Sequence, residues 1–340
     1  MPAMTPPLSR RRLLAAFAAL PLVAAVPGAG WAADAEKVTV ALDWYPNADH
    51  AGLFLAQQRG YFANEGLQVD LYTPSDPTTV LQTVGAGKDT FGISYQTDVL
   101  LARAQGVPVV SVAALVQHPL LAVMAKKEAA ITRPRDLVGK TVGYPGIPSQ
   151  EAFLATMLET DGAKLADVTL VNVSFNLVPA LISGQVAAVM GAYWTHETIL
   201  AEREGYPVDI LRVEEWGVPD YYELVLVASE ETVADRADLV TAFLRAIQHG
   251  YDDAIADQAA ALDALASAYE AIDRDVESEG LRLLVPVWTD GITAFGEQTP
   301  ARWDTYGAWM KQRGLIPADL DVARAYTTTL LPMPQATPTA

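Results

Sequence analysis

Large aromatic side chains stand in four loops of the sequence, each directly after a segment with the composition of a β-strand. The rings are those of Trp44, Tyr95, Tyr144 and Trp194. Ordinary turns are built mostly from Gly, Asn, Asp, Ser and Pro. Any single ring can be core packing, but four rings at strand ends favour a groove that stacks on a flat ligand.

Polar side chains in the same loops offer hydrogen bonds to such a ligand, and each also fits a structural role. Glu197 either accepts N–H bonds from a heterocycle or complements the positive end of a helix that Thr195 would cap. His50 is either a ligand contact or a histidine satisfied by the backbone at a helix start. Asn47 is either a ligand contact or a helix cap. The sequence leaves these alternatives open.

The charge of the loops narrows the class of ligand. They contain no Lys or Arg, so His50 and His196 are their only possible cations. Recognition of an anion needs cationic side chains or densely placed N–H groups. We therefore expect a neutral or weakly basic aromatic ligand.

Composition excludes several other functions. The chain of 340 residues has 41 Asp and Glu against 23 Lys and Arg, a net charge of −18. Phosphate contacts need Lys and Arg, so no nucleic-acid partner is expected. The absence of cysteine excludes disulfides, thiolate metal sites and cysteine nucleophiles. With only four histidines we expect no metal and no other cofactor.

The first 35 residues are typical of a cleaved export signal. Ser9 precedes three arginines at 10–12, an apolar run covers 13–26, and small residues follow at 30–35. This order of a basic, an apolar and a small-residue region is that of a secretory signal, and consecutive arginines resemble a twin-arginine signal. We expect a mature protein that is soluble and exported, in the periplasm or at the cell surface.

The remaining chain alternates strands with helices. The predicted strands are 38–42, 66–71, 90–94, 109–115, 120–125, 140–144, 168–173, 186–190 and 223–229. Predicted helices between them include 78–86, 99–105, 150–159, 178–183 and a long one at 238–271. This order predicts an α/β fold of doubly wound parallel sheets with helices on both faces. In such sheets ligands bind beyond the carboxyl ends of the strands, which is where the aromatic loops stand.

Two interruptions divide the chain. Charge and proline break an apolar stretch between 126 and 135, and Gly and Pro precede a new strand near 216–222. We predict a first lobe of residues 36–127 plus 219–330, with a second lobe, 128–218, inserted in it. Residues 331–340 are expected to be a loose tail. Two chain crossings predict a hinge and a cleft between the lobes.

The motifs of the loops resemble those of one protein family. The segments are Leu42–Leu53, Gly60–Leu67, Gly92–Gln96, Val142–Gly146, Gly191–Glu197 and Gly217–Leu224. In this order they are similar to the SsuA/THI5-like periplasmic binding proteins over about residues 38–330. The resemblance implies a type II periplasmic binding protein fold, with two doubly wound lobes around a cleft. It also implies an ABC importer whose permease is the partner of a monomeric binding protein.

Within that family the chain most resembles the branch that binds formylaminopyrimidine, a thiamine precursor, and next the riboflavin-binding branch. The resemblance implies that rings at Trp44 and Tyr193 sandwich the heterocycle while Glu197 bonds its amino group. The full set of expected ligand-binding residues is Trp44, Asn47, His50, Ser94, Tyr95, Tyr144, Gly146, Asn176, Tyr193, Trp194, Glu197 and Tyr222.

The family also contains a pyrimidine synthase branch. That branch has a Lys and a His where this chain has Ser94 and Asp98, and it needs a cysteine cluster that this chain lacks. No nucleophile elbow is present either. The resemblance therefore predicts a binding protein and not an enzyme.

Overall fold

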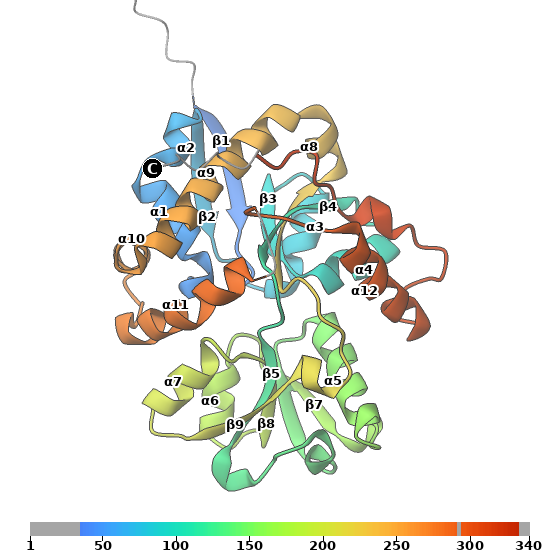
Figure 1. The fold of residues 1–340 in the computed structure, drawn as a ribbon. Helices are drawn as coiled ribbons and strands as arrows, with labels where there is room; N and C mark the ends of the chain where they lie inside the picture. Colours follow the sequence, from blue (N-terminus) through green and yellow to red (C-terminus); the bar gives the residue numbers. More distant parts are fainter. Residues whose placement is uncertain (1–34, 291–293, 333–340) are drawn as a thin grey trace, which may run out of the picture. The chain divides into compact units, whose positions relative to one another are not determined.

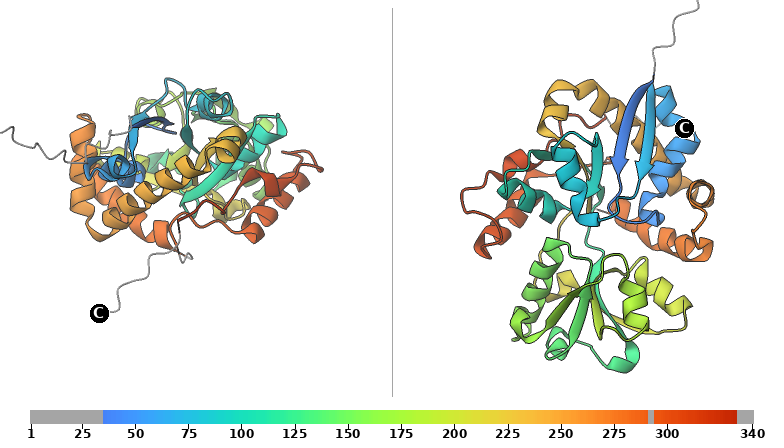
Figure 2. Two further views of the ribbon diagram at one scale, coloured as in Figure 1. Left: turned by 90° about the horizontal axis from the view of Figure 1, so that it is seen from above. Right: turned by 180° about the vertical axis from the view of Figure 1, so that it is seen from behind.

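The computed structural model of the protein describes residues 35–290 and 294–332. All but the last residue of the predicted export signal lies outside this described part, as does most of the predicted tail at 331–340. The described chain forms two five-stranded sheets with helices packed on both faces of each, as Figures 1 and 2 show. This is the predicted α/β class.

The first sheet has the strand order β2-β1-β3-β10-β4. Its strands are β1 (Glu36–Ala41), β2 (Leu67–Tyr72), β3 (Phe91–Ser94), β4 (Val109–Val116) and β10 (Leu224–Ser229). All five begin and end within two residues of the predicted ranges. β1 is parallel to β2 and β3, whereas β10 is antiparallel to β3 and β4.

The second sheet has the order β7-β6-β8-β5-β9. Its strands are β5 (Leu121–Lys126), β6 (Thr141–Tyr144), β7 (Thr169–Asn172), β8 (Ala188–Tyr193) and β9 (Val208–Arg212). β5 is antiparallel to β8 and β9. The sequence analysis missed β9, a half-buried edge strand whose polar residues mask a strand pattern.

The antiparallel strands β5 and β10 begin where the chain crosses between the sheets (Figure 1). In each sheet the parallel strands end on the side from which the chain crosses over. A strand that begins directly after a crossing therefore starts at those strand ends and runs antiparallel to its neighbours. The sheets are therefore mixed, and the prediction of wholly parallel sheets was wrong. The predicted boundary at 127 also put β5 with the first lobe, whereas β5 is hydrogen-bonded into the second sheet. The chain makes its first crossing at 117–120, before β5.

Helices cover the sheets in two groups. Those that follow strands of the first sheet are α1 (Ala51–Gln58), α2 (Tyr61–Asn64), α3 (Val80–Gly85), α4 (Gln96–Ala104), α8 (Glu230–Asp235), α9 (Ala237–Ala256), α10 (Gln258–Ala268), α11 (Arg274–Thr289) and α12 (Pro300–Gln312). Those that follow strands of the second are α5 (Pro148–Thr160), α6 (Leu177–Ile182) and α7 (Glu197–Arg203).

The long helix predicted at 238–271 is two helices. α9 ends before Asp257, whose side chain caps α10 by accepting a hydrogen bond from the backbone N–H of Ala260 at 3.0 Å. α9 packs tightly on α1, where a Cβ on Gly250 would lie 2.1 Å from the carbonyl oxygen of Gly52. Only glycine permits this approach, which holds the loop between β1 and α1 against the first sheet.

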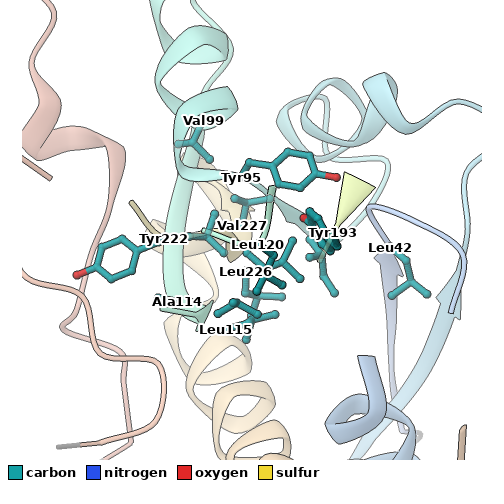
Figure 3. Close-up of a cluster of buried hydrophobic side chains, with 14 of the residues drawn as sticks. Leu42, Tyr95, Val99, Ala114, Leu115, Leu120, Tyr193, Tyr222, Leu226 and Val227 are labelled. Carbon is teal, nitrogen blue, oxygen red and sulfur yellow. The ribbon is translucent and has the colours of Figure 1, made fainter. Parts of the chain in front are cut away.

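One large buried cluster contains residues of both sheets. Figure 3 shows its central part, where Tyr95 and Tyr193 lie with Leu42, Leu120 and Leu226. The two tyrosines are less than a tenth exposed. Rings predicted to meet a ligand are thus anchored in the core, which fixes their orientation.

Candidate functional site

A pocket of about 280 Å³ lies between loops of the two sheets. Its lining residues are Asp43, Trp44, Asn47, Tyr95, Gln150, Gly191, Tyr193 and Glu197. The first four follow β1 and β3 of the first sheet; the others belong to α5, β8 and α7 of the second. Five of the twelve predicted ligand-binding residues are brought together here, at the carboxyl ends of strands.

Asp43 connects the two loops that the first sheet contributes to the pocket, the loop after β1 and the loop after β3. Its Oδ1 lies 2.9 Å from Nε2 of His50, and its Oδ2 accepts a hydrogen bond from the Tyr95 hydroxyl at 3.0 Å. The backbone N–H of Asn47 donates to Nδ1 of His50 at 3.3 Å, so the proton of a neutral ring lies on Nε2 and is donated to Asp43. His50 is fully buried behind Asp43 and positions it.

Asn47 has the capping role that the sequence left open. Its side-chain oxygen accepts a hydrogen bond from the backbone N–H of Asp49 at 2.9 Å and caps a short 3₁₀ turn, Ala48–His50. It also lines the pocket. The cap fixes Asn47 and, through the turn that follows, His50.

Glu197 is the first residue of α7, and the residue before it, His196, occupies the cap position. Thr195 was therefore wrongly predicted as the cap. One carboxylate oxygen of Glu197 accepts a hydrogen bond from the backbone N–H of Tyr193 at 2.8 Å. Burial raises the pKa of Glu197, and the neighbouring His196 and the Tyr193 N–H lower it in part. Glu197 thus has a structural bond and lines the pocket.

Tyr193 connects the pocket to the crossings between the sheets. Its hydroxyl donates to Glu223 at 3.2 Å. Glu223 is fully buried and also accepts hydrogen bonds from the backbone N–H groups of Leu120 and Leu121, at 2.6 and 3.2 Å, and from the Tyr221 hydroxyl at 2.9 Å. Glu223 therefore ties together both crossing segments. Burial raises its pKa to about 8 despite these donors.

Burial also shapes the ionisation of His196, at the start of α7. Burial alone would lower its pKa, but the carboxylates of Glu197, Glu277 and Asp49 raise it to about 9. Its Nδ1 lies 3.4 Å from Glu277 on α11. The other oxygen of Glu277 accepts a hydrogen bond from the backbone N–H of Ala48 at 2.7 Å. This contact joins α7 of the second sheet to elements of the first.

Together with Asp43, Gln150 and Gly191 are the lining residues that sequence reasoning missed. Gly191 has φ +105°, and a Cβ there would lie 2.2 Å from Oε1 of Gln150. That oxygen is buried and has no hydrogen-bond partner. Gln150 directly follows the third aromatic-bearing loop, which contains Tyr144, and its polar side chain at a helix start was the available signal.

A second cavity, of about 490 Å³, lies beside the first and shares Tyr95 with it. It is lined by Ser94, a predicted site residue, and by Asp98, Ile147 and Pro148 among others. Asp98 on α4 accepts a hydrogen bond from the Ser149 hydroxyl on α5 at 2.5 Å. Burial raises the pKa of Asp98 to about 6. This bond links the two sheets on the side of the pocket opposite His196 and Glu277.

The other predicted ligand-binding residues lie outside both cavities. Trp194 stacks under the Arg212 guanidinium, 4.2 Å from the ring centroid. Tyr222 is buried under Arg302 and accepts a hydrogen bond from the backbone N–H of Thr299. 

Tyr144 ends β6, half-buried, and Asn176 is exposed just before α6. Gly146 has φ +87°, with Asn172 where its Cβ would lie. The direct role predicted for these residues stays a prediction.

Phe175 is a further ring that sequence reasoning did not select. It comes from the loop before α6 and lies with its centroid 4.6 Å from that of Trp44 and 4.5 Å from that of Tyr45. The described residues include no cluster of three or more His, Asp or Glu placed to hold a metal. The site is thus a small, ring-lined and carboxylate-bearing pocket.

The sequence has relatives among characterised families. It matches the family described as NMT1/THI5 like over residues 47–261. A formylaminopyrimidine-binding protein of Halalkalibacterium halodurans is 39% identical over 81% of this chain and 84% of its own length. The riboflavin-binding protein RibY of Chloroflexus aurantiacus is 30% identical, covering 93% and 91%. A 4-amino-5-hydroxymethyl-2-methylpyrimidine phosphate synthase of Aspergillus parasiticus is 31% identical, covering 67% and 69%.

Solved structures agree on the fold. The alkanesulfonate-binding protein SsuA from Xanthomonas axonopodis pv. citri, bound to MOPS, has a TM-score of 0.69 at 16% identity, covering 87% of this chain and 99% of that chain. At this identity the likeness concerns the fold, which is that of periplasmic binding proteins. With this fold and a family match that covers more than half of its length, the chain belongs to the NMT1/THI5-like family.

Proposed function

We propose that the protein is the extracytoplasmic solute-binding component of an ABC importer and that it binds a flat heterocycle of the aminopyrimidine type, a thiamine precursor. The observation that carries this proposal is the pocket that Trp44, Tyr193 and Glu197 line together between the two sheets. The 39% identity to a formylaminopyrimidine-binding protein supports the same class of ligand.

The pocket has the parts that such a ligand needs. Trp44 and Tyr193 offer rings for stacking, each worth about 1 kcal/mol beyond the area buried. Glu197 offers a carboxylate oxygen for an amino group, a bond worth about 2 kcal/mol. Together with burial of the ring these contacts reach the roughly 8 kcal/mol that micromolar binding requires.

Contacts between the two sheets surround the pocket and suit a protein that closes on its ligand. Asp98 and Ser149 meet on one side, and His196 and Glu277 on the other. The chain crosses between the sheets at 117–120 and 213–223, and Glu223 holds both crossings. In our proposal these crossings act as a hinge, and the closed form is what the permease recognises.

A riboflavin-binding importer component is the second candidate. The cavity beside the pocket shares Tyr95 with it and extends the lined surface to Ser94, Asp98 and Ile147. RibY, at 30% identity, supports this alternative.

A catalytic role is not part of the proposal. Where the resemblance implies a Lys and a His for the synthase branch, this chain has Ser94 and Asp98, and Asp98 is engaged by Ser149. The whole sequence contains no cysteine.

Export is inferred from the predicted arginine-led signal at 1–35, of which only Ala35 lies within the described residues. Within the described part of the chain, no helix has both the length and the apolar composition to cross a bilayer.

Native mass spectrometry of protein purified without denaturation tests this function. We expect either a co-purified aminopyrimidine or binding of added formylaminopyrimidine in a 1:1 complex. Riboflavin, added in parallel, discriminates the second candidate. Absence of binding by both compounds at concentrations well above micromolar would overturn the proposal.

A further inference from the structure

Hydrogen bonds within the protein occupy the hydroxyl donors of the pocket. The Tyr95 hydroxyl donates to Asp43, and the Tyr193 hydroxyl donates to Glu223. The backbone N–H of Tyr193 is likewise engaged, by Glu197. A carboxylate has about four acceptor positions, so Asp43 and Glu197 both keep capacity to accept further bonds.

Gln150 adds another acceptor. Its Oε1 is buried without a hydrogen-bond partner, directly against Gly191. A buried polar atom left in this state is costly. A ligand that fills the pocket with N–H groups would satisfy it, whereas a ligand that presents only acceptors would leave it unsatisfied.

The charges around the pocket are mostly negative. No Lys or Arg lines it, and Asp43 and Glu197 do. Titratable groups face these carboxylates from every surrounding element: Asp49 and His50 after β1, Tyr95 after β3, Tyr193 at the end of β8, His196 before α7, Glu223 before β10, Tyr251 on α9 and Glu277 on α11. His196, the basic group nearest Glu197, is paired with Glu277.

We propose that the pocket binds its heterocycle as a cation, protonated on the ring nitrogen beside the amino group, and that Asp43 and Glu197 select this form. This inference rests on the proposed function. In a protonated 4-aminopyrimidine the amino group and the ring N–H form an amidinium, whose two parallel donors match a carboxylate as a guanidinium does. The proton comes from solvent when the ring binds.

Two consequences distinguish this binding mode. The isoalloxazine ring of riboflavin has no amino group beside a ring nitrogen, so it cannot present this pair of donors and gains nothing from the second carboxylate. Affinity for the pyrimidine should fall by up to about tenfold for each pH unit above the pKa of the free ring, because only the protonated fraction binds well. At low pH protonation of Glu197, whose pKa burial raises, weakens binding again.

Nuclear magnetic resonance with formylaminopyrimidine labelled with nitrogen-15 in the ring tests the inference. The measurement is made above the pKa of the free ligand, on the saturated complex. We expect one ring nitrogen to show a directly bonded proton, absent from the free ligand. A bound ring in which neither nitrogen carries a proton would overturn the inference and leave the proposed function intact. A ligand that does not bind at all would overturn the function itself.

Variants show which carboxylates hold the proton. Glu197→Gln and Asp43→Asn keep the shape of each side chain and should each lower affinity at least tenfold above the pKa of the ring. Exposed Glu231 in the first turn of α8 supplies the matched control, Glu231→Gln. Asp43 also holds Tyr95 and His50 in place, so thermal unfolding must first show that Asp43→Asn is folded. If Asp43→Asn is unfolded, the result for Glu197→Gln decides the test. Unchanged affinity in a folded Glu197→Gln or Asp43→Asn variant would contradict its assignment.

Discussion

Glu223 lies where both crossing segments meet, and its ionisation should appear in the stability of the whole protein. Three of its four donors converge on one oxygen, from Leu120, Leu121 and Tyr221. The other oxygen accepts the hydrogen bond from the Tyr193 hydroxyl at 3.2 Å and keeps a second position at which a proton can bind. Burial raises the pKa of Glu223 from 4.5 to about 8, so the folded protein binds this proton where the unfolded chain has released it.

The sign of the effect follows from proton linkage. Between about pH 4.5 and 8 the native state holds one more proton than the unfolded state at this site. Glu223 therefore contributes stability that is fully present below its unfolded pKa and is lost as pH rises to its folded pKa, by about 1.4 kcal/mol per pH unit.

Glu223→Gln removes this dependence, because glutamine resembles the protonated carboxyl and does not ionise. We expect the variant to be within about 1.5 kcal/mol of the wild type near pH 5, since the bonds on the shared oxygen are kept. Its stability relative to the wild type should then rise steadily towards pH 8. Urea unfolding of both proteins at a series of pH values, analysed with a common m-value, measures the difference in their free energies of unfolding. A difference independent of pH would refute the raised pKa of Glu223.

Three further predictions concern the pocket and its closure. Trp44→Ala should lower affinity for the aminopyrimidine by about 2 kcal/mol, roughly 30-fold, with a smaller loss of stability because Trp44 is only half-buried; calorimetry that finds equal affinities would exclude stacking on this ring. Gly191→Ala should cost about 1–3 kcal/mol of stability, because φ is +105° there and the new Cβ would meet Gln150; a melting temperature equal to that of the wild type would contradict the geometry. Asp98→Ala removes the bond to Ser149 between α4 and α5, so small-angle scattering should show a less compact ligand-bound state than in the wild type; superimposable curves would count against this contact as a closing element.

The loops that form the pocket could be predicted because their residues are contiguous in sequence. Trp44 and Asn47 follow β1 within a few residues, and Tyr193 and Glu197 stand at the junction of β8 and α7. Strand ends and aromatic content selected the loops and the ring of Trp44, whereas Tyr193 was selected only through the family resemblance. Trp194 was selected on the same grounds as Trp44, but successive residues near a strand end point in opposite directions. The ring of Tyr193 faces the pocket, while that of Trp194 lies under Arg212.

Residues whose role depends on a distant partner could not be recognised from the sequence. Nothing in its loop distinguishes Asp43 from other loop aspartates, and its role becomes visible only when the fold brings Tyr95, which follows β3, within hydrogen-bond distance. Glu223 becomes significant only when Leu120 and Leu121 return beside it from about a hundred residues earlier. The direction of β5 was missed for the same reason, since strand composition does not reveal which sheet provides the neighbours.

The central claim is that Glu197 faces a bound aminopyrimidine between the two sheets. Calorimetric titration of formylaminopyrimidine into the wild type, Glu197→Gln and the exposed control Glu231→Gln tests it most directly. We expect the Glu197 variant to lose about 1.5–3 kcal/mol of binding free energy, roughly 10- to 100-fold in affinity, while the control binds like the wild type. Equal affinities in all three proteins, with Glu197→Gln still folded, would contradict the assignment of Glu197 to the ligand and leave it only its bond to the backbone of Tyr193.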